Sequence, residues 1–172
     1  MSDESMFDGI EDEKSSEGGR YFPEGIHAVM ISSVKRRKGF KGKSFIVEAT
    51  LLASTNPQAA VGSDYTWLQK MEKEGALSRV KTFAMRATNS EENEITSAVM
   101  EQLAGNEQPL VGLLISVEGY PTQTKKGDNI TAVKWVTLEG EKLKGAYATA
   151  KRLGVFKQPC ALQAEILKKI AA

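Results

Sequence analysis

Cysteine and histidine, the residue types that most often bind zinc, are scarce in this chain of 172 residues, which has one of each. The single cysteine, Cys160, cannot form a disulfide within the chain, and its immediate neighbours offer no base to activate a thiol. The histidine, His27, has no companion ligands of the kind that a zinc site requires, so a structural role is favoured. We therefore expect neither a metal nor a cofactor.

Long apolar runs are missing as well. No stretch of about 18 apolar residues is present, so no membrane-spanning helix is expected, and the acidic first residues lack the charged-then-apolar pattern of a signal peptide. Phosphate-binding glycine motifs and a nucleophilic serine elbow are also absent. Asp64 and Asp128, with the glutamates of residues 91–94, could bind magnesium for a nuclease, but acids in loops and at helix starts are normally solvated. These absences favour a soluble intracellular binding protein over an enzyme.

The chain does contain a dense basic stretch at residues 35–43, where six of nine residues are cations and one, Phe40, is aromatic. So many cations cannot be buried without partners, so we expect this stretch to project into solvent as a loop. Positive charge gathered around an aromatic ring is typical of a loop that contacts a phosphate backbone and stacks on a base. The alternative is a solvated hairpin tip that is basic for solubility only.

Charge is divided unevenly along the chain. Residues 1–20 hold seven acidic and two basic residues, a net charge of −5, which leaves +6 for residues 21–172. Only Met6, Phe7 and Ile10 are sizeable apolar residues in this first segment, too few to offset the entropy of ordering it, so a disordered tail is expected. Such a tail could compete with nucleic acid for a basic surface, recruit a partner through Met6 and Phe7, or serve solubility alone.

The hydrophobic pattern predicts three strands, a helical insert, two strands and then helices. Alternating or β-branched apolar residues predict strands at residues 21–34, 44–53, 61–71, 110–123 and 130–138. Apolar residues at helical spacing predict helices at residues 76–87, 91–103, 145–153 and 162–171. The second of these helices is expected to be capped by Asn89 or Ser90.

This order of elements is that of the OB-fold, a five-stranded Greek-key barrel whose ligand-binding face lies on strands two and three. The loops that join strands one to two and four to five flank that face, and both are basic here. We therefore predict a mainly β protein with helices. An acidic tail at residues 1–20 would precede an OB-like domain at residues 21–140, and a helical extension at residues 141–172 would pack on the barrel.

The candidate nucleic-acid-binding residues are the cations of the two loops and aromatic rings near them. Phe40 is the best stacking candidate because it lies in a loop, whereas a ring within a strand of a small barrel is more often a core residue. The predicted site residues are Lys35, Arg36, Arg37, Lys38, Phe40, Lys41, Lys43, Tyr65, Trp67, Lys125 and Lys126.

Short segments of the chain carry a resemblance to known proteins. They lie at residues 24–29, 54–57, 61–63, 76–77, 80–83 and 131–135, together with Trp67. In these segments, over roughly residues 21–138, the chain resembles a family of bacteriophage early proteins with an OB-like fold, proposed or shown to bind single-stranded DNA.

The resemblance implies a sequence-independent single-stranded DNA-binding protein of phage DNA replication or recombination. The expected location is the cytoplasm of a host cell, without membrane association, and phage or host replication and recombination proteins are candidate partners. A phage structural or adaptor β-barrel protein without a nucleic-acid ligand, and an RNA-binding module, remain alternatives, because fold does not determine ligand and stacking serves both nucleic acids. The oligomeric state is also left open.

Overall fold

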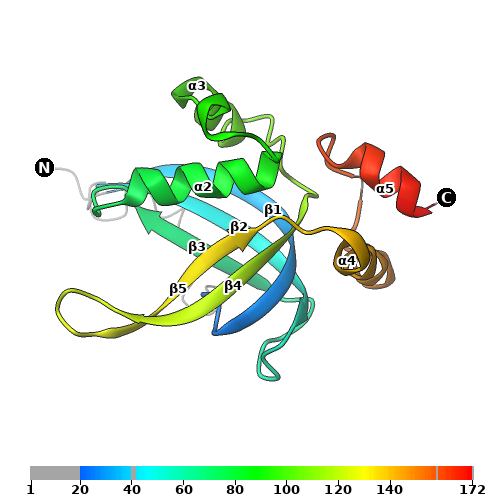
Figure 1. The fold of residues 1–172 in the computed structure, drawn as a ribbon, viewed down its shortest axis with the longest axis horizontal. Helices are drawn as coiled ribbons and strands as arrows, with labels where there is room; N and C mark the ends of the chain where they lie inside the picture. Colours follow the sequence, from blue (N-terminus) through cyan, green and yellow to red (C-terminus); the bar gives the residue numbers. More distant parts are fainter. Residues whose placement is uncertain (1–19, 40–41, 158, 172) are drawn as a thin grey trace, which may run out of the picture.

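The computed structural model describes residues 20–39, 42–157 and 159–171, whose arrangement is shown in Figure 1. In this part of the chain, five strands form one antiparallel sheet: β1 (Gly25–Gly39), β2 (Gly42–Ser54), β3 (Asp64–Lys70), β4 (Leu114–Gln123) and β5 (Asn129–Val136). Between β3 and β4 lie α2 (Ala76–Thr88), the short 3₁₀ helix η2 (Glu92–Glu94) and α3 (Ser97–Leu103). After β5 come α4 (Gly140–Arg152) and α5 (Ala164–Ala171). The predicted class, mainly β with helices, and the predicted order of elements are confirmed.

The sheet is open, with the strand order β3-β2-β1-β4-β5. Strands β3 and β5 are therefore its two edges, and no hydrogen-bonded ladder joins them within the described residues. Their side chains meet instead, since the ring centroids of Trp67 on β3 and Trp135 on β5 lie 5.6 Å apart. The sheet curls far enough for its edge strands to share one core.

The segment before β1 contacts both edge strands. Tyr21 forms an isolated parallel bridge with Thr66 of β3. The buried ring of Phe22 stacks on the Tyr65 ring of β3, with 5.6 Å between the ring centroids. It meets the Trp135 ring of β5 edge-on, with 6.0 Å between the centroids. An aromatic side chain thus fills the open side of the sheet, where a closed barrel would have a strand ladder.

His27 fastens this segment to the sheet. Its Nε2 lies 2.8 Å from the carbonyl oxygen of Pro23, which can only accept, so Nε2 carries the proton and donates. In the neutral ring Nδ1 then accepts from the Ser54 hydroxyl at 2.7 Å. The Pro23 carbonyl also passes so close to Gly119 of β4 that a side chain there would collide with it. The buried histidine is structural, as its sequence context suggested.

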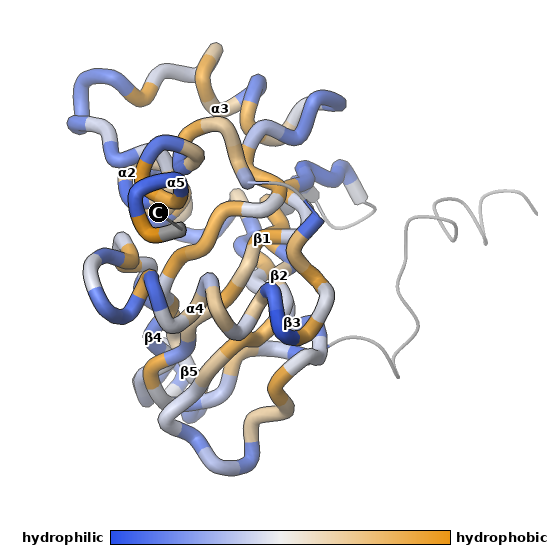
Figure 2. Tube along the Cα trace, turned by 90° about the vertical axis from the view of Figure 1, so that its right-hand side faces the viewer, coloured by the Kyte–Doolittle hydropathy of each residue, from blue (hydrophilic) through white to orange (hydrophobic). Residues whose placement is uncertain are grey.

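Two apolar clusters cover the two faces of the sheet. The larger cluster lies under α2, where the centroid of the Phe83 ring is 4.8 Å from that of Trp135 and 5.8 Å from that of Phe45. The other cluster lies on the opposite face, where Leu143 of α4 and Leu167 of α5 are buried with residues of β1, β2 and β4. Figure 2 shows the hydrophobic residues concentrated along the strands. No helix within the described residues is long and apolar enough to cross a membrane.

Several element boundaries differ from the sequence-based expectations. The first strand begins at Gly25 rather than residue 21, because the preceding residues cross to β3. The second predicted helix is divided in two, and α3 begins only after Thr96, whose hydroxyl accepts from the Val99 N–H at 3.2 Å. Helix α4 starts at Gly140, five residues earlier than expected. Over its described residues the basic stretch is not a loop, since β1 extends to Gly39 and β2 begins at Gly42.

Candidate functional site

The cations of the basic stretch form the distal half of the β1–β2 hairpin. Lys38 lies directly opposite Lys43 in the register of the two strands. Paired residues of antiparallel strands share a face of the sheet, and successive residues alternate between faces. Arg36, Lys38 and Lys43 therefore lie on one face, and Lys35 and Arg37 on the other. A charge run that is continuous in sequence is divided between two sides in space.

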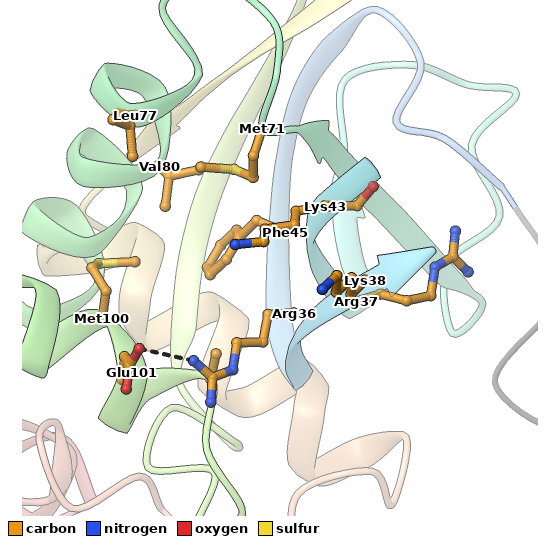
Figure 3. Close-up of a pocket in the computed structure, with 12 residues that line it drawn as sticks. Arg36, Arg37, Lys38, Lys43, Phe45, Met71, Leu77, Val80, Met100 and Glu101 are labelled. Carbon is orange, nitrogen blue, oxygen red and sulfur yellow. Dashed lines mark ion pairs between the residues drawn. The ribbon is translucent and has the colours of Figure 1, made fainter. Parts of the chain in front are cut away.

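A groove of about 450 Å³ lies between the first of these faces and the helices α2 and α3 (Figure 3). Phe45 lies at its centre, with apolar side chains of α2 and α3 on one side and the hairpin cations on the other. Arg37 extends away from this centre, as strand alternation requires. The basic groove, as we call it, is lined by Arg36, Arg37, Lys38, Lys43, Ser44, Phe45, Met71, Leu77, Val80, Met100, Glu101 and Ala104.

Lys38 and Lys43 form the least compensated part of this surface. Like charges directly opposite one another destabilise an antiparallel pair, and neither ammonium group forms a salt bridge with any described residue. The Glu72 carboxylate lies beside Gly42 at the start of β2. An anion bound between the two ammonium groups would relieve their repulsion, so this pair is suited to a phosphate.

Other predicted cations already have carboxylate partners. Surface ion pairs contribute only about 0–1 kcal/mol, so exposed cations can exchange a carboxylate for an anionic ligand at low cost. The ion pair between Arg36 and Glu101 lies in the groove and is drawn as a dashed line in Figure 3. The three pairs are Lys35–Glu48 at 3.3 Å, Arg36–Glu101 at 3.1 Å and Lys125–Glu74 at 2.7 Å.

The second basic loop does not border this groove. Lys125 and Lys126 lie between β4 and β5, and neither is among the lining residues. Lys125 reaches Glu74 in the turn between β3 and α2, and Met71 at the start of that turn lines the groove. This turn therefore stands between the two basic regions. The expected arrangement, one groove bracketed by two basic loops, is replaced by one groove on the first hairpin.

The two strand aromatics of the predicted site lie in the core. The exposed fraction is 5% for Tyr65 and 8% for Trp67, because the inner side of a curved sheet must be filled by large side chains. Neither ring is free to stack on a base in this structure, so both are removed from the candidate interface. Phe40 and Lys41 lie outside the described residues, and their predicted roles stay predictions.

The helix residues of the groove were not predicted. Leu77 of α2 is 77% exposed, and Met100 and Glu101 come from α3. An exposed leucine beside a buried stripe is a weak signal of a binding surface. Nothing in the linear sequence indicates that α3 lies beside the basic hairpin.

Other reactive groups are buried or dispersed. Cys160 is buried and its thiol donates to the carbonyl oxygen of Pro109 at 3.0 Å. Burial raises the pKa of the Cys160 thiol, so the thiol is protonated at neutral pH. Across residues 20–39, 42–157 and 159–171, no group of three or more His, Cys, Asp or Glu side chains is placed to hold a metal ion.

No model of a known protein family matches this chain, and no curated protein matches it in sequence. A function is therefore inferred from the groove, a basic rim over an apolar floor.

Proposed function

We propose that the protein binds single-stranded nucleic acid, without strong sequence preference, along the basic groove. DNA is the ligand we favour, in phage DNA replication or recombination, on the resemblance described above. The observation that carries the proposal is the uncompensated pair of Lys38 and Lys43, which lies on the rim of an apolar groove together with Arg36.

The lining of the groove suits the two parts of a single strand. Ammonium and guanidinium groups on the rim can contact successive phosphates, and this term supplies most of the affinity in sequence-independent binding. The side chains of Met71, Leu77 and Met100 offer apolar surface to sugars and base faces. A single strand exposes those faces, whereas a duplex buries them in its stack. Single strands should therefore bind more tightly than duplexes.

The topology supports an OB-like fold for this module. An OB-fold is a five-stranded, partly open Greek-key barrel, and its first strand lies between the second and the fourth, as in the order β3-β2-β1-β4-β5. The edges that a closed barrel would join approach through Trp67 and Trp135. Helix α2 follows β3, which is where the fold has its helix. The groove lies against α2 and α3 rather than on the outer face of β2 and β3.

A direct test is fluorescence anisotropy with labelled oligonucleotides: single-stranded DNA, the matching duplex and single-stranded RNA of equal length. Single strands should bind more tightly than duplex, and the logarithm of affinity should fall with the logarithm of salt concentration by about 0.7 per phosphate contact. Equal or better duplex affinity, or a flat salt response, would contradict the proposal. Absence of any binding at low salt would favour the adaptor alternative. Tighter binding of single-stranded RNA than of single-stranded DNA would identify RNA as the ligand.

A matched pair of charge reversals locates the site. Lys38→Glu with Lys43→Glu should weaken single-strand binding by about tenfold or more, because each lysine loses a phosphate contact. Lys142→Glu with Lys144→Glu makes the same charge change at exposed positions of α4 and should have a much smaller effect. Equal losses in both double variants would show that net charge, and not the groove, determines binding.

A further inference from the structure

The distal half of β1 has a free edge. The side-chain amide of Gln108 donates to the Val34 carbonyl oxygen at 2.7 Å and accepts from the Val34 N–H at 2.8 Å. Both backbone groups of Val34 therefore point away from β2. Backbone groups alternate sides along a strand, so those of Arg36 and Lys38 also point away from β2. Neither residue has a backbone hydrogen-bond partner on that side among the described residues.

This free edge lies beside the basic groove, which Arg36 and Lys38 both line. A strand added there would form backbone hydrogen bonds with both residues. It would place every second side chain over the groove, near Met100 and Leu77. Main-chain pairing combined with a surface for alternate side chains is how extended peptides add to a sheet. The edge is thus suited to an extended polypeptide as well as to phosphates.

The positive charge of the edge favours an acidic segment over a second copy of the edge as its occupant. A second copy of this edge would bring Arg36 and Lys38 against the same cations, which like-charge repulsion disfavours. The first 19 residues of the chain have the opposite character, with seven acids, one lysine and no proline. Every one of them after the first can therefore donate a backbone N–H. In an extended strand Met6 and Ile10 share one face, so both can lie over the groove.

The segment is long enough to reach the edge within one molecule. It ends next to Arg20, whose carbonyl accepts from Thr66 of β3. Arg20 and Tyr21 lie along the outer edge of β3, and β3, β2 and β1 separate them from the position of the added strand. The span is therefore about 19 Å at the usual strand spacing of about 4.8 Å. An extended chain covers about 3.3 Å per residue, so about six residues can cross and the rest can pair.

We propose that the acidic segment at residues 1–19 adds to the free edge of β1 as an extra strand, with Met6 and Ile10 over the basic groove. The segment then covers the cations of the rim. On the proposed function, it also competes with single-stranded nucleic acid for the groove. The pairing itself does not depend on that function.

Hydrogen exchange followed by NMR on the full chain tests the pairing. The amides of Arg36 and Lys38 should exchange at least about tenfold more slowly in the wild type than in a Met6→Ser, Asp8→Lys, Ile10→Ser variant, because opening of the added strand exposes them. The Val34 amide is an internal control, since Gln108 holds it in both proteins. Identical exchange at Arg36 and Lys38 in both proteins would overturn the proposal.

A proline substitution separates pairing from charge. Lys38→Pro removes the edge N–H as well as the ammonium group, whereas Lys38→Ala removes the ammonium group alone. A spin label on Ser5→Cys should broaden the Met100 methyl resonance in the wild-type background, and Lys38→Pro should reduce this broadening well below its level in Lys38→Ala. Equal broadening in the two variants would contradict strand addition. Protection that persists without the acidic segment and rises with protein concentration would identify a second copy instead.

The two proposals can fail separately. Slow exchange at Arg36 and Lys38 without oligonucleotide binding would retain the strand addition and reject the proposed function. Tight oligonucleotide binding with unprotected edge amides would do the reverse.

Discussion

The two halves of β1 have different surroundings. The first half pairs with β2 on one side and with β4 on the other, and is buried between two apolar clusters. Among the strands that the structure describes, the second half, beyond Val34, has only β2 beside it, and it carries exposed cations. Gln108 marks the boundary, because its amide replaces the missing strand at Val34. One continuous strand is part of the core where both of its edges are covered, and it is a candidate interaction surface where one edge is free.

The largest expected effect lies in the covered half of the molecule. Trp67→Ala should lower the free energy of unfolding by about 3–5 kcal/mol, because a large buried ring is replaced by a cavity. Urea denaturation measures the change. Tyr120→Ala is a control, since Tyr120 is 42% exposed and its loss should cost little. A Trp67→Ala protein of full stability that no longer binds oligonucleotide would return this ring to the interface.

Loss of the Gln108 amide, at the boundary between the halves, should lower the free energy of unfolding. Gln108→Ala leaves the buried N–H and C=O of Val34 without partners, and an unmet buried polar group costs about 1–3 kcal/mol. Gln108→Glu keeps an acceptor for the N–H but places a carboxylate against the carbonyl, so it should also destabilise the fold. Urea denaturation at neutral pH checks both. If neither variant loses stability, Gln108 does not mark the boundary.

The free half should show a stacking contribution that is separate from charge. Phe40→Ala should reduce the free energy of single-strand binding by about 1–3 kcal/mol, as expected when an aromatic ring that stacks on a base is lost. The salt slope should be nearly unchanged because no phosphate contact is removed. Anisotropy titrations at several salt concentrations measure both quantities. A reduced salt slope with little loss of affinity would show that Phe40 only positions the neighbouring cations.

The smallest expected effect is a gain. Glu101→Gln removes the carboxylate that pairs with Arg36, which frees a guanidinium group for phosphate. Since an exposed ion pair contributes at most about 1 kcal/mol, the affinity for single strands should rise by up to about fivefold. Glu92→Gln, which breaks the ion pair with Lys81 on the insert, is the matched control and should leave affinity unchanged. A similar gain in both variants would indicate a general effect of net charge.

Local sequence patterns were sufficient for the elements and their order. Alternating apolar residues predicted all five strands, and helical spacing predicted α2 closely, because these signals depend on neighbours within a few residues. Strand ends were predicted poorly. The cations of residues 35–43 resemble a loop in composition, yet lysine and arginine stems can follow a strand while their charged ends remain in water.

Tertiary structure alone decided the candidate site. The sequence by itself determined that the cations must be exposed and that most large rings must be buried, because burying unpaired charge is costly and burying apolar surface is favourable. It could not determine that α2 and α3 lie beside the hairpin, that Lys38 faces Lys43, or that Tyr65 and Trp67 turn inward. Those outcomes depend on strand register and on contacts between segments far apart in the chain. No local pattern records such contacts, because their free energy arises only when the whole sheet has formed.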